Sequence, residues 1–166
     1  MIYATILDDG EKYYTHMRKI FDALGNAQTK YNWLITDCEC CSTSSDIVEL
    51  LSGEYCWISG EKLTSIVNQE DFQWIWAVLS GFEKNISIDQ VLQHPLPYAN
   101  EYTGFWDNPI SMQHPLATIE IVTCDSTLTL FFSKNKKIMD SYKKAFPLCK
   151  DLELYNKEFA ICERKK

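Results

Sequence analysis

The residues best suited to chemistry lie together in the pentapeptide Asp37-Cys38-Glu39-Cys40-Cys41. Thiolates and carboxylates this close could bind a soft metal ion. However, the C-x-C-C spacing lacks a second Cys or His pair at structural-zinc distance, and neighbouring cysteines seldom ligate one tetrahedral ion. A nucleophilic cysteine needs a nearby cation or His, whereas the local neighbours are acidic. We therefore predict no metal, cofactor or catalytic thiol, while leaving metal binding by Cys38, Cys40 and Cys41 open.

A second group of candidates lies in the loop predicted for residues 93–116, where four prolines interrupt regular structure. Loops of this length are usually functional or mobile. The sequence Gln-His-Pro-Leu occurs twice, placing His94 and His114 twenty residues apart. A general-base site would combine one of these histidines with Glu101 or Asp107. This gives the alternative function of a small hydrolase or small-ligand binder.

Aromatic and acidic side chains gather between the two histidines. Such residues on an irregular segment suit a recognition surface for a basic or amphipathic partner. The same residues could instead fold back as a lid over the sheet. We predict that they bind a partner: Tyr98, Glu101, Tyr102, Phe105, Trp106 and Asp107.

The charge distribution favours a cationic partner over nucleic acid. Residues 1–132 contain 18 carboxylates and 6 bases, a net charge of -12, and there is no Lys or Arg between Lys84 and Lys134. Such a stretch predicts an acidic face that repels phosphate backbones. We therefore expect a non-enzymatic interaction protein that docks on a basic protein, and an immunity protein against a bacterial toxin is one concrete version.

Neither enzyme motifs nor targeting signals add to this interpretation. The chain contains no G-x-S-x-G, P-loop, G-x-G-x-x-G, H-E-x-x-H or paired C-x-x-C sequence. The N-terminus lacks a basic start with a long apolar region, and the longest apolar run, Trp74–Leu79, is far shorter than a membrane span. We expect a cytoplasmic protein that does not contact membranes, with its seven cysteines reduced.

The hydrophobic periodicity predicts an α+β fold for one domain over residues 1–166. The clearest signal is a β-hairpin over residues 117–134, which we place at the centre of the sheet, with Glu120 on a solvent-facing side. We expect a single mostly antiparallel sheet of five to seven strands, some parallel pairing being possible, with two main helices packed against it and a charged tail at about 163–166. The main helices are predicted at 12–24 and 136–146, further strands at 2–7, 31–36, 55–58, 72–79 and 152–155.

The first half of the chain also resembles a known family. The motifs are Tyr31-Asn32-Trp33, then Tyr55-Cys56-Trp57-Ile58-Ser59-Gly60-Glu61, then Trp76-Ala77-Val78. In this order they are similar to a family of small uncharacterised proteins from Bacillus-type bacteria. The resemblance implies a bacterial, cytoplasmic, single-domain protein and no particular activity.

Overall fold

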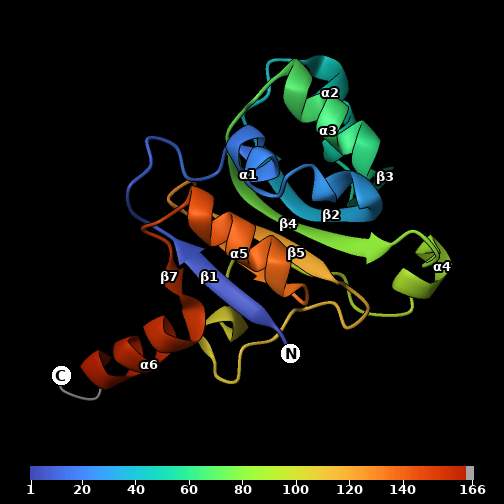
Figure 1. The fold of residues 1–166 in the computed structure, drawn as a ribbon. Helices are drawn as coiled ribbons and strands as arrows, with labels where there is room; N and C mark the ends of the chain where they lie inside the picture. The colour runs from blue at the N-terminus through green and yellow to red at the C-terminus, as the bar shows by residue number, and fades with distance from the viewer. Residues whose placement is uncertain (164–166) are drawn as a thin grey trace.

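One antiparallel sheet of seven strands organises the protein in a computed structural model that describes residues 1–163 (Figure 1). Its spatial order is β3-β2-β4-β5-β6-β1-β7, which places β5 in the centre as predicted for the hairpin. The prediction of a mostly antiparallel sheet is confirmed, since every pair of described strands is antiparallel and the parallel pairing that the sequence left open does not occur among them. The strands are β1 Tyr3–Leu7, β2 Tyr31–Cys40, β3 Tyr55–Ser59, β4 Trp74–Glu83, β5 Ile119–Cys124, β6 Leu128–Ser133 and β7 Lys150–Asp151.

Six α-helices occur within the described residues, so the prediction of two main helices is not confirmed. They are α1 Met17–Ala23, α2 Ser45–Leu51, α3 Gly60–Gln69, α4 Ile88–Val91, α5 Lys136–Ala145 and α6 Leu152–Glu163, with 3-10 turns at Ala27–Lys30 and Gly104–Trp106. None of these helices is both long and apolar enough to cross a membrane. Residues 164–166 of the predicted charged tail lie outside the described part of the chain.

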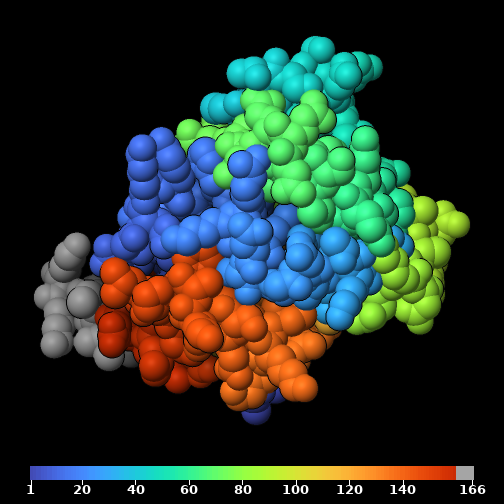
Figure 2. Space-filling model, turned by 45° about the horizontal axis from the view of Figure 1, so that its top comes forward, coloured from blue at the N-terminus to red at the C-terminus, as the bar shows by residue number. Residues whose placement is uncertain are grey.

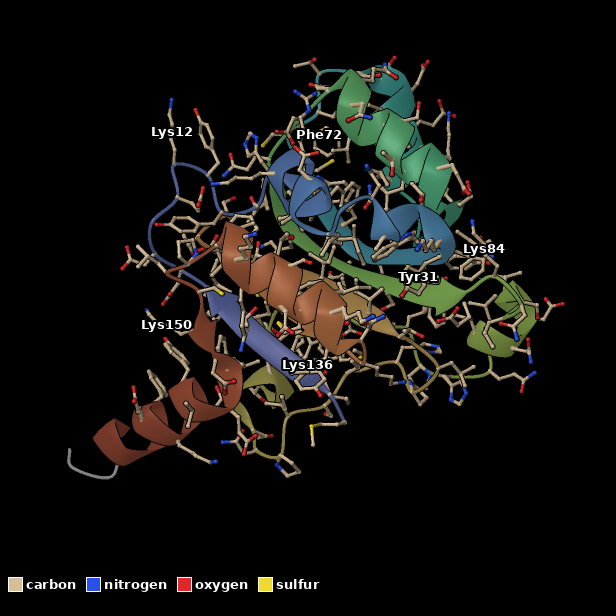
Figure 3. All side chains as sticks on the ribbon, in the orientation of Figure 1. Lys12, Tyr31, Phe72, Lys84, Lys136 and Lys150 are labelled. Atoms are coloured by element: carbon tan, nitrogen blue, oxygen red, sulfur yellow. The ribbon has the colours of Figure 1, made fainter. Side chains whose placement is uncertain are left out.

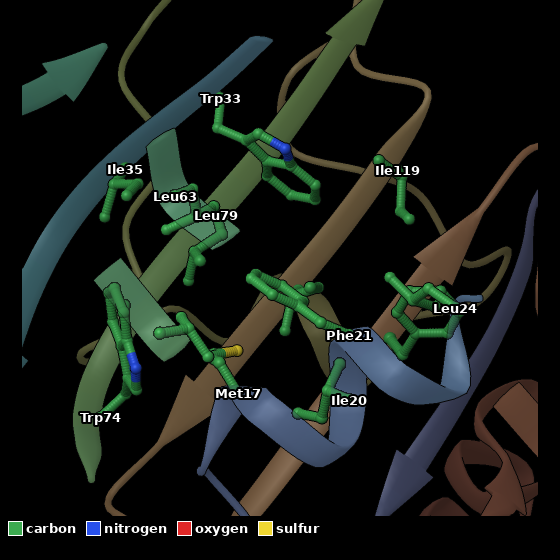
Figure 4. Packing of buried hydrophobic residues seen from close by; sticks show 14 of the residues in the cluster. Met17, Ile20, Phe21, Leu24, Trp33, Ile35, Leu63, Trp74, Leu79 and Ile119 are labelled. Atoms are coloured by element: carbon green, nitrogen blue, oxygen red, sulfur yellow. The ribbon is translucent and has the colours of Figure 1, made fainter. Parts of the chain in front are cut away.

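One face of the sheet is covered by α1, α2, α3 and α5. Their apolar side chains pack against large residues of the strands, including Trp33 and Trp74, both almost fully buried (Figure 4). The Trp33 indole Nε1 donates a hydrogen bond to the Gln28 carbonyl at 2.9 Å, so its one polar atom is satisfied. This face provides the larger part of the core.

The opposite face is covered by residues 84–118, which connect β4 to β5, together with the start of α6. We call residues 84–118 the covering segment. Ala99, Phe105 and Met112 are buried there against Val78, Val122 and other strand residues. The segment predicted as a loop at 93–116 therefore does fold back over the sheet. Because both faces are covered, strands β4 and β5 are largely buried on both sides.

Several local predictions were wrong for reasons that the packing explains. Residues 152–155 begin α6 rather than forming a strand, because Asp151 Oδ1 accepts a hydrogen bond from Leu154 N at 3.2 Å and starts the helix. The first helix begins at Met17, not residue 12, because the backbone at Thr15 and His16 pairs with the beginning of β4. Glu120 is fully buried, since the covering segment lies over its side of the hairpin.

Candidate functional site

A hollow of about 470 Å³ lies where β2, the turn before β3 and the covering segment meet. It is lined by Thr36, Asp37, Cys38, Glu39, Gly53, Glu54, Trp76, Leu96, Pro97, Tyr98 and Asn100. Its lining includes three carboxylates and two large aromatic rings but no Lys, Arg or His. We call this hollow the acidic groove.

Asp37 holds the two walls of the acidic groove together. The residue adopts a left-handed conformation with a φ of 49°, which Asp tolerates better than most residues, at an irregularity in β2. Its Oδ2 atom accepts hydrogen bonds from the backbone N–H groups of Ala99 at 2.7 Å and Asn100 at 2.8 Å. One carboxylate thus fixes the position of the covering segment beside β2.

The other two carboxylates of the acidic groove remain available to a ligand. Glu39 and Glu54 are exposed, and neither takes part in an ion pair among the described side chains. Trp76 and Tyr98 form aromatic walls, and the Tyr98 side chain is 49% exposed. Carboxylates beside accessible aromatic faces are the groups that bind guanidinium and ammonium ions.

A second hollow of about 210 Å³ continues the acidic groove along the covering segment. Trp76 lines both hollows, and the second is also bordered by Glu101, Tyr102 and Trp106. Tyr98 and Tyr102 stack edge to face, with ring centroids 5.1 Å apart. The two hollows therefore form one acidic and aromatic surface.

The structure brings all but one of the predicted partner-binding residues to this surface. Tyr98 lines the acidic groove, while Glu101, Tyr102 and the 38% exposed Trp106 line the second hollow. Phe105 also borders the second hollow, but it is only 3% exposed and belongs to the core, so its side chain is largely inaccessible to a partner. Asp107 is exposed but lies outside the linings of both hollows.

His94 and His114 are neighbours, with ring centroids 5.2 Å apart. His114 is fully buried, and its Nε2 lies 3.1 Å from the Val91 carbonyl oxygen while its Nδ1 accepts from Leu116 N at 3.3 Å. Because a carbonyl can only accept, Nε2 must carry the proton. Burial lowers the pKa of His114, which keeps it neutral. Both nitrogens thus hold the backbone and neither is left to act as a base.

A buried polar cluster lies beneath the covering segment at Glu120. The Glu120 carboxyl accepts hydrogen bonds from Ser80 Oγ at 3.2 Å and from Gln113 N at 3.3 Å. Burial raises the pKa of Glu120 to about 7, even though these hydrogen bonds act in the opposite direction. This group joins the covering segment to the centre of the sheet.

Most carboxylates of residues 1–132 are not neutralised by the described bases of the C-terminal part in the folded protein. Among the described side chains, the Asp8–Lys150 contact at 2.8 Å is the one ion pair that joins a carboxylate of residues 1–132 to a base of residues 133–166. The labelled Lys136 and Lys150 lie near β1, β7, α5 and α6, away from α2 and α3 (Figure 3). Residues 37–71 contain eight carboxylates and one base, Lys62, a net charge of -7 that equals that of the whole chain.

Sequence reasoning missed Asp37, Glu39, Glu54 and Trp76 as parts of one site. Asp37 and Glu39 were considered as metal ligands, but no group of three or more His, Cys, Asp and Glu in the described residues could hold a metal ion. Trp76 was assigned to a central strand, where it does lie, at a point left partly open by the covering segment. The one sequence signal for the groove was the concentration of acids.

Comparisons with protein-family models, curated proteins and solved structures find no match to this chain. The fold and the groove therefore define the class of protein by themselves: an α+β protein with an acidic, aromatic-walled surface groove.

Proposed function

We propose that the protein is a non-enzymatic binding protein whose acidic groove holds a positively charged segment of a basic protein partner. The observation that carries the proposal is the lining of the groove, in which the exposed Glu39 and Glu54 stand beside Trp76 and Tyr98 without a neutralising base. An immunity protein that docks on a basic bacterial toxin is one concrete version of this function.

Arginine is the side chain that best complements these walls. A planar guanidinium can stack on an indole or phenol ring while its N–H groups bond to a carboxylate, a combination that a lysine ammonium matches less well. The excess of negative charge in residues 37–71 would also attract a basic partner before contact. Binding should therefore be fast and should weaken as salt increases.

Exposed apolar side chains beside the acidic groove extend this interface. Val48 and Leu50 on α2 and Tyr55 on β3 are each more than a third exposed. The chain around α2 protrudes at one end of the surface, away from the C-terminal segments (Figure 2). Strand β3 is also an edge of the sheet, with unpaired backbone groups on its outer side. These features supply the apolar contact that ion pairs alone would lack.

The alternative of a small hydrolase using His94 and His114 has weaker support. Both His114 nitrogens bond to the backbone, and neither His94 nor His114 lines the acidic groove or the second hollow. An esterase assay on the wild-type protein and on a His94→Ala variant tests this alternative directly. Activity in the wild type that is lost in the variant would support the hydrolase function.

The binding proposal is tested with an arginine-rich decapeptide as the probe and isothermal titration calorimetry as the measurement. The double variant Glu39→Gln/Glu54→Gln should weaken binding by about 5-fold to 30-fold, because two partly exposed charge contacts contribute roughly 1–2 kcal/mol together. The matched control is Asp89→Asn/Glu158→Gln, which removes the same charge from exposed sites outside the groove.

The control should bind the peptide within about twofold of the wild type. Equal weakening by both double variants would show that peptide affinity depends only on net charge. It would refute specific binding in the acidic groove. In the same titration followed by NMR, the Trp76 indole resonance should shift. A titration that leaves Trp76 unaffected would equally refute the proposal.

A further inference from the structure

Cys38 and Cys40 come together at the end of β2, on the side of the sheet covered by α2. Both thiols are free, and both line a hollow of about 200 Å³ together with Glu39, Val48, Leu51 and Ser52. Both side chains also pack against the core on this face of the sheet. Two cysteines that line one open hollow form a pair that a small molecule can reach.

The backbone explains why these thiols meet. Residues two apart in a chain have Cα atoms separated by at most about 7 Å, and both thiols line the same hollow. This limit includes the range of about 4.4–6.8 Å that disulfides accept. The pairing of β2 with β4 shifts between Thr36 and Glu39, next to the left-handed Asp37, and again between Glu39 and Cys40, so the strand is irregular at this point.

The surroundings of the two sulfurs differ. The neighbouring Cys38 thiol and the Ser42 backbone N–H lower the pKa of Cys40 to about 7, against the effects of burial and of Glu70. The neighbouring Cys40 thiol, together with burial, raises the pKa of Cys38. Acidic neighbours in the sequence suggested that these thiols would be unreactive. The direction of the pKa shift is the opposite for Cys40.

We propose that Cys38 and Cys40 form a redox-active thiol pair that exchanges with small organic disulfides. The Cys40 thiolate attacks one sulfur of the organic disulfide, forms a mixed disulfide and releases one thiolate. The Cys38 sulfur then attacks Cys40 and forms the intramolecular disulfide, and its proton leaves with the second released thiol. Two protein thiols are oxidised to one disulfide, and the organic disulfide is reduced to two thiols.

This inference does not rest on the acidic groove being a binding site. It does join the two features, because Cys38 and Glu39 line both the thiol hollow and the acidic groove. Closure of the disulfide would change the irregular part of β2 that includes Asp37, whose carboxylate holds Ala99 and Asn100. Oxidation of the two cysteines would thereby change the shape of the acidic groove.

The test uses the reduced full-length protein with oxidised glutathione as the probe and intact-mass spectrometry as the measurement. The wild type should lose two hydrogen atoms without retaining glutathione. Cys38→Ala should stop at a stable adduct with one glutathione, and Cys40→Ala should not form the intramolecular bond. The matched control is Cys41→Ser, which removes an exposed thiol from the same segment and should behave as the wild type does.

Two results would overturn the proposal. One is a persistent glutathione adduct on the wild type, and the other is loss of the intramolecular bond in Cys41→Ser or in Cys56→Ser. A measurement on the wild type alone guards against misfolded variants: alkylation of Cys40 by iodoacetamide, followed against pH by peptide mass spectrometry. Its midpoint should lie near pH 7, and a midpoint at the ordinary thiol pKa of about 8.5 would also refute the proposal.

Discussion

Replacement of Glu120 by Gln should remove a strong pH dependence from the stability of this protein. Glu120 lies on the central strand β5, fully buried beneath the covering segment. The variant keeps the shape of the side chain. Its amide oxygen can accept from Gln113 N and its amide nitrogen can donate to Ser80 Oγ, so the present contacts can be retained.

The direction of the effect follows from the pKa values of the two states. Burial raises the pKa of Glu120 from 4.5 to about 7 in the folded protein. Between these values the folded state binds more protons than the unfolded state, so stability falls as pH rises. The contribution of protonated Glu120 is complete below pH 4.5, is lost as pH rises to about 7 and is absent above it. The difference corresponds to about 3 kcal/mol, at 1.36 kcal/mol per pKa unit.

The assay is urea unfolding followed by tryptophan fluorescence from pH 5 to pH 8.5. The unfolding free energy of Glu120→Gln minus that of the wild type should increase by roughly 2.5 kcal/mol across this range. Glu83→Gln, an exposed carboxylate at the end of β4, is the control and should show no such trend. Parallel curves for Glu120→Gln and the wild type would show that Glu120 is not kept protonated by burial, and the reasoning would fail.

Two further substitutions test the packing that positions the site. Gly60→Ala should lower the unfolding free energy by about 1–3 kcal/mol in urea titrations, because a Cβ at Gly60 would clash with the Gln28 carbonyl oxygen, while Gly53→Ala has ordinary contacts and should change it little. A normal midpoint for Gly60→Ala would contradict this account. Asp37→Ala should remove the acceptor of two backbone N–H groups, lower stability by roughly 2 kcal/mol and speed hydrogen exchange at Ala99. Unchanged exchange at Ala99 would show that Asp37 does not hold the covering segment.

The sequence predicted the elements whose patterns are local. The alternation in residues 117–134 correctly gave the hairpin of β5 and β6, and its position at the centre of the sheet is confirmed. The apolar run at 72–79 was correctly predicted as a central strand, but the strand continues through Gly81. Glycine is needed there because a Cβ would clash with Ile119 on β5, a contact between strands that is invisible in the local sequence.

The site was predicted less well because it joins distant segments. Tyr98 and Glu101 could be proposed from the composition of one loop, yet Asp37 contacts residues about sixty positions later. The lowered pKa of Cys40 was not predicted because the neighbouring Cys38 thiol and the Ser42 N–H outweigh the effect of burial and of Glu70. Glu120 was placed in solvent because alternation shows that a strand has two faces but not what covers each one.

Composition and periodicity therefore determined on their own that the protein is α+β, rich in carboxylates and built around an antiparallel hairpin. Those properties depend on which residues are present and on their spacing along a few positions. The tertiary structure alone decided which carboxylates are buried, paired or exposed and which aromatic rings stand beside them. The reason is that charge interactions, burial and hydrogen bonds depend on distance in space, and the covering segment sets those distances only once it folds across the sheet.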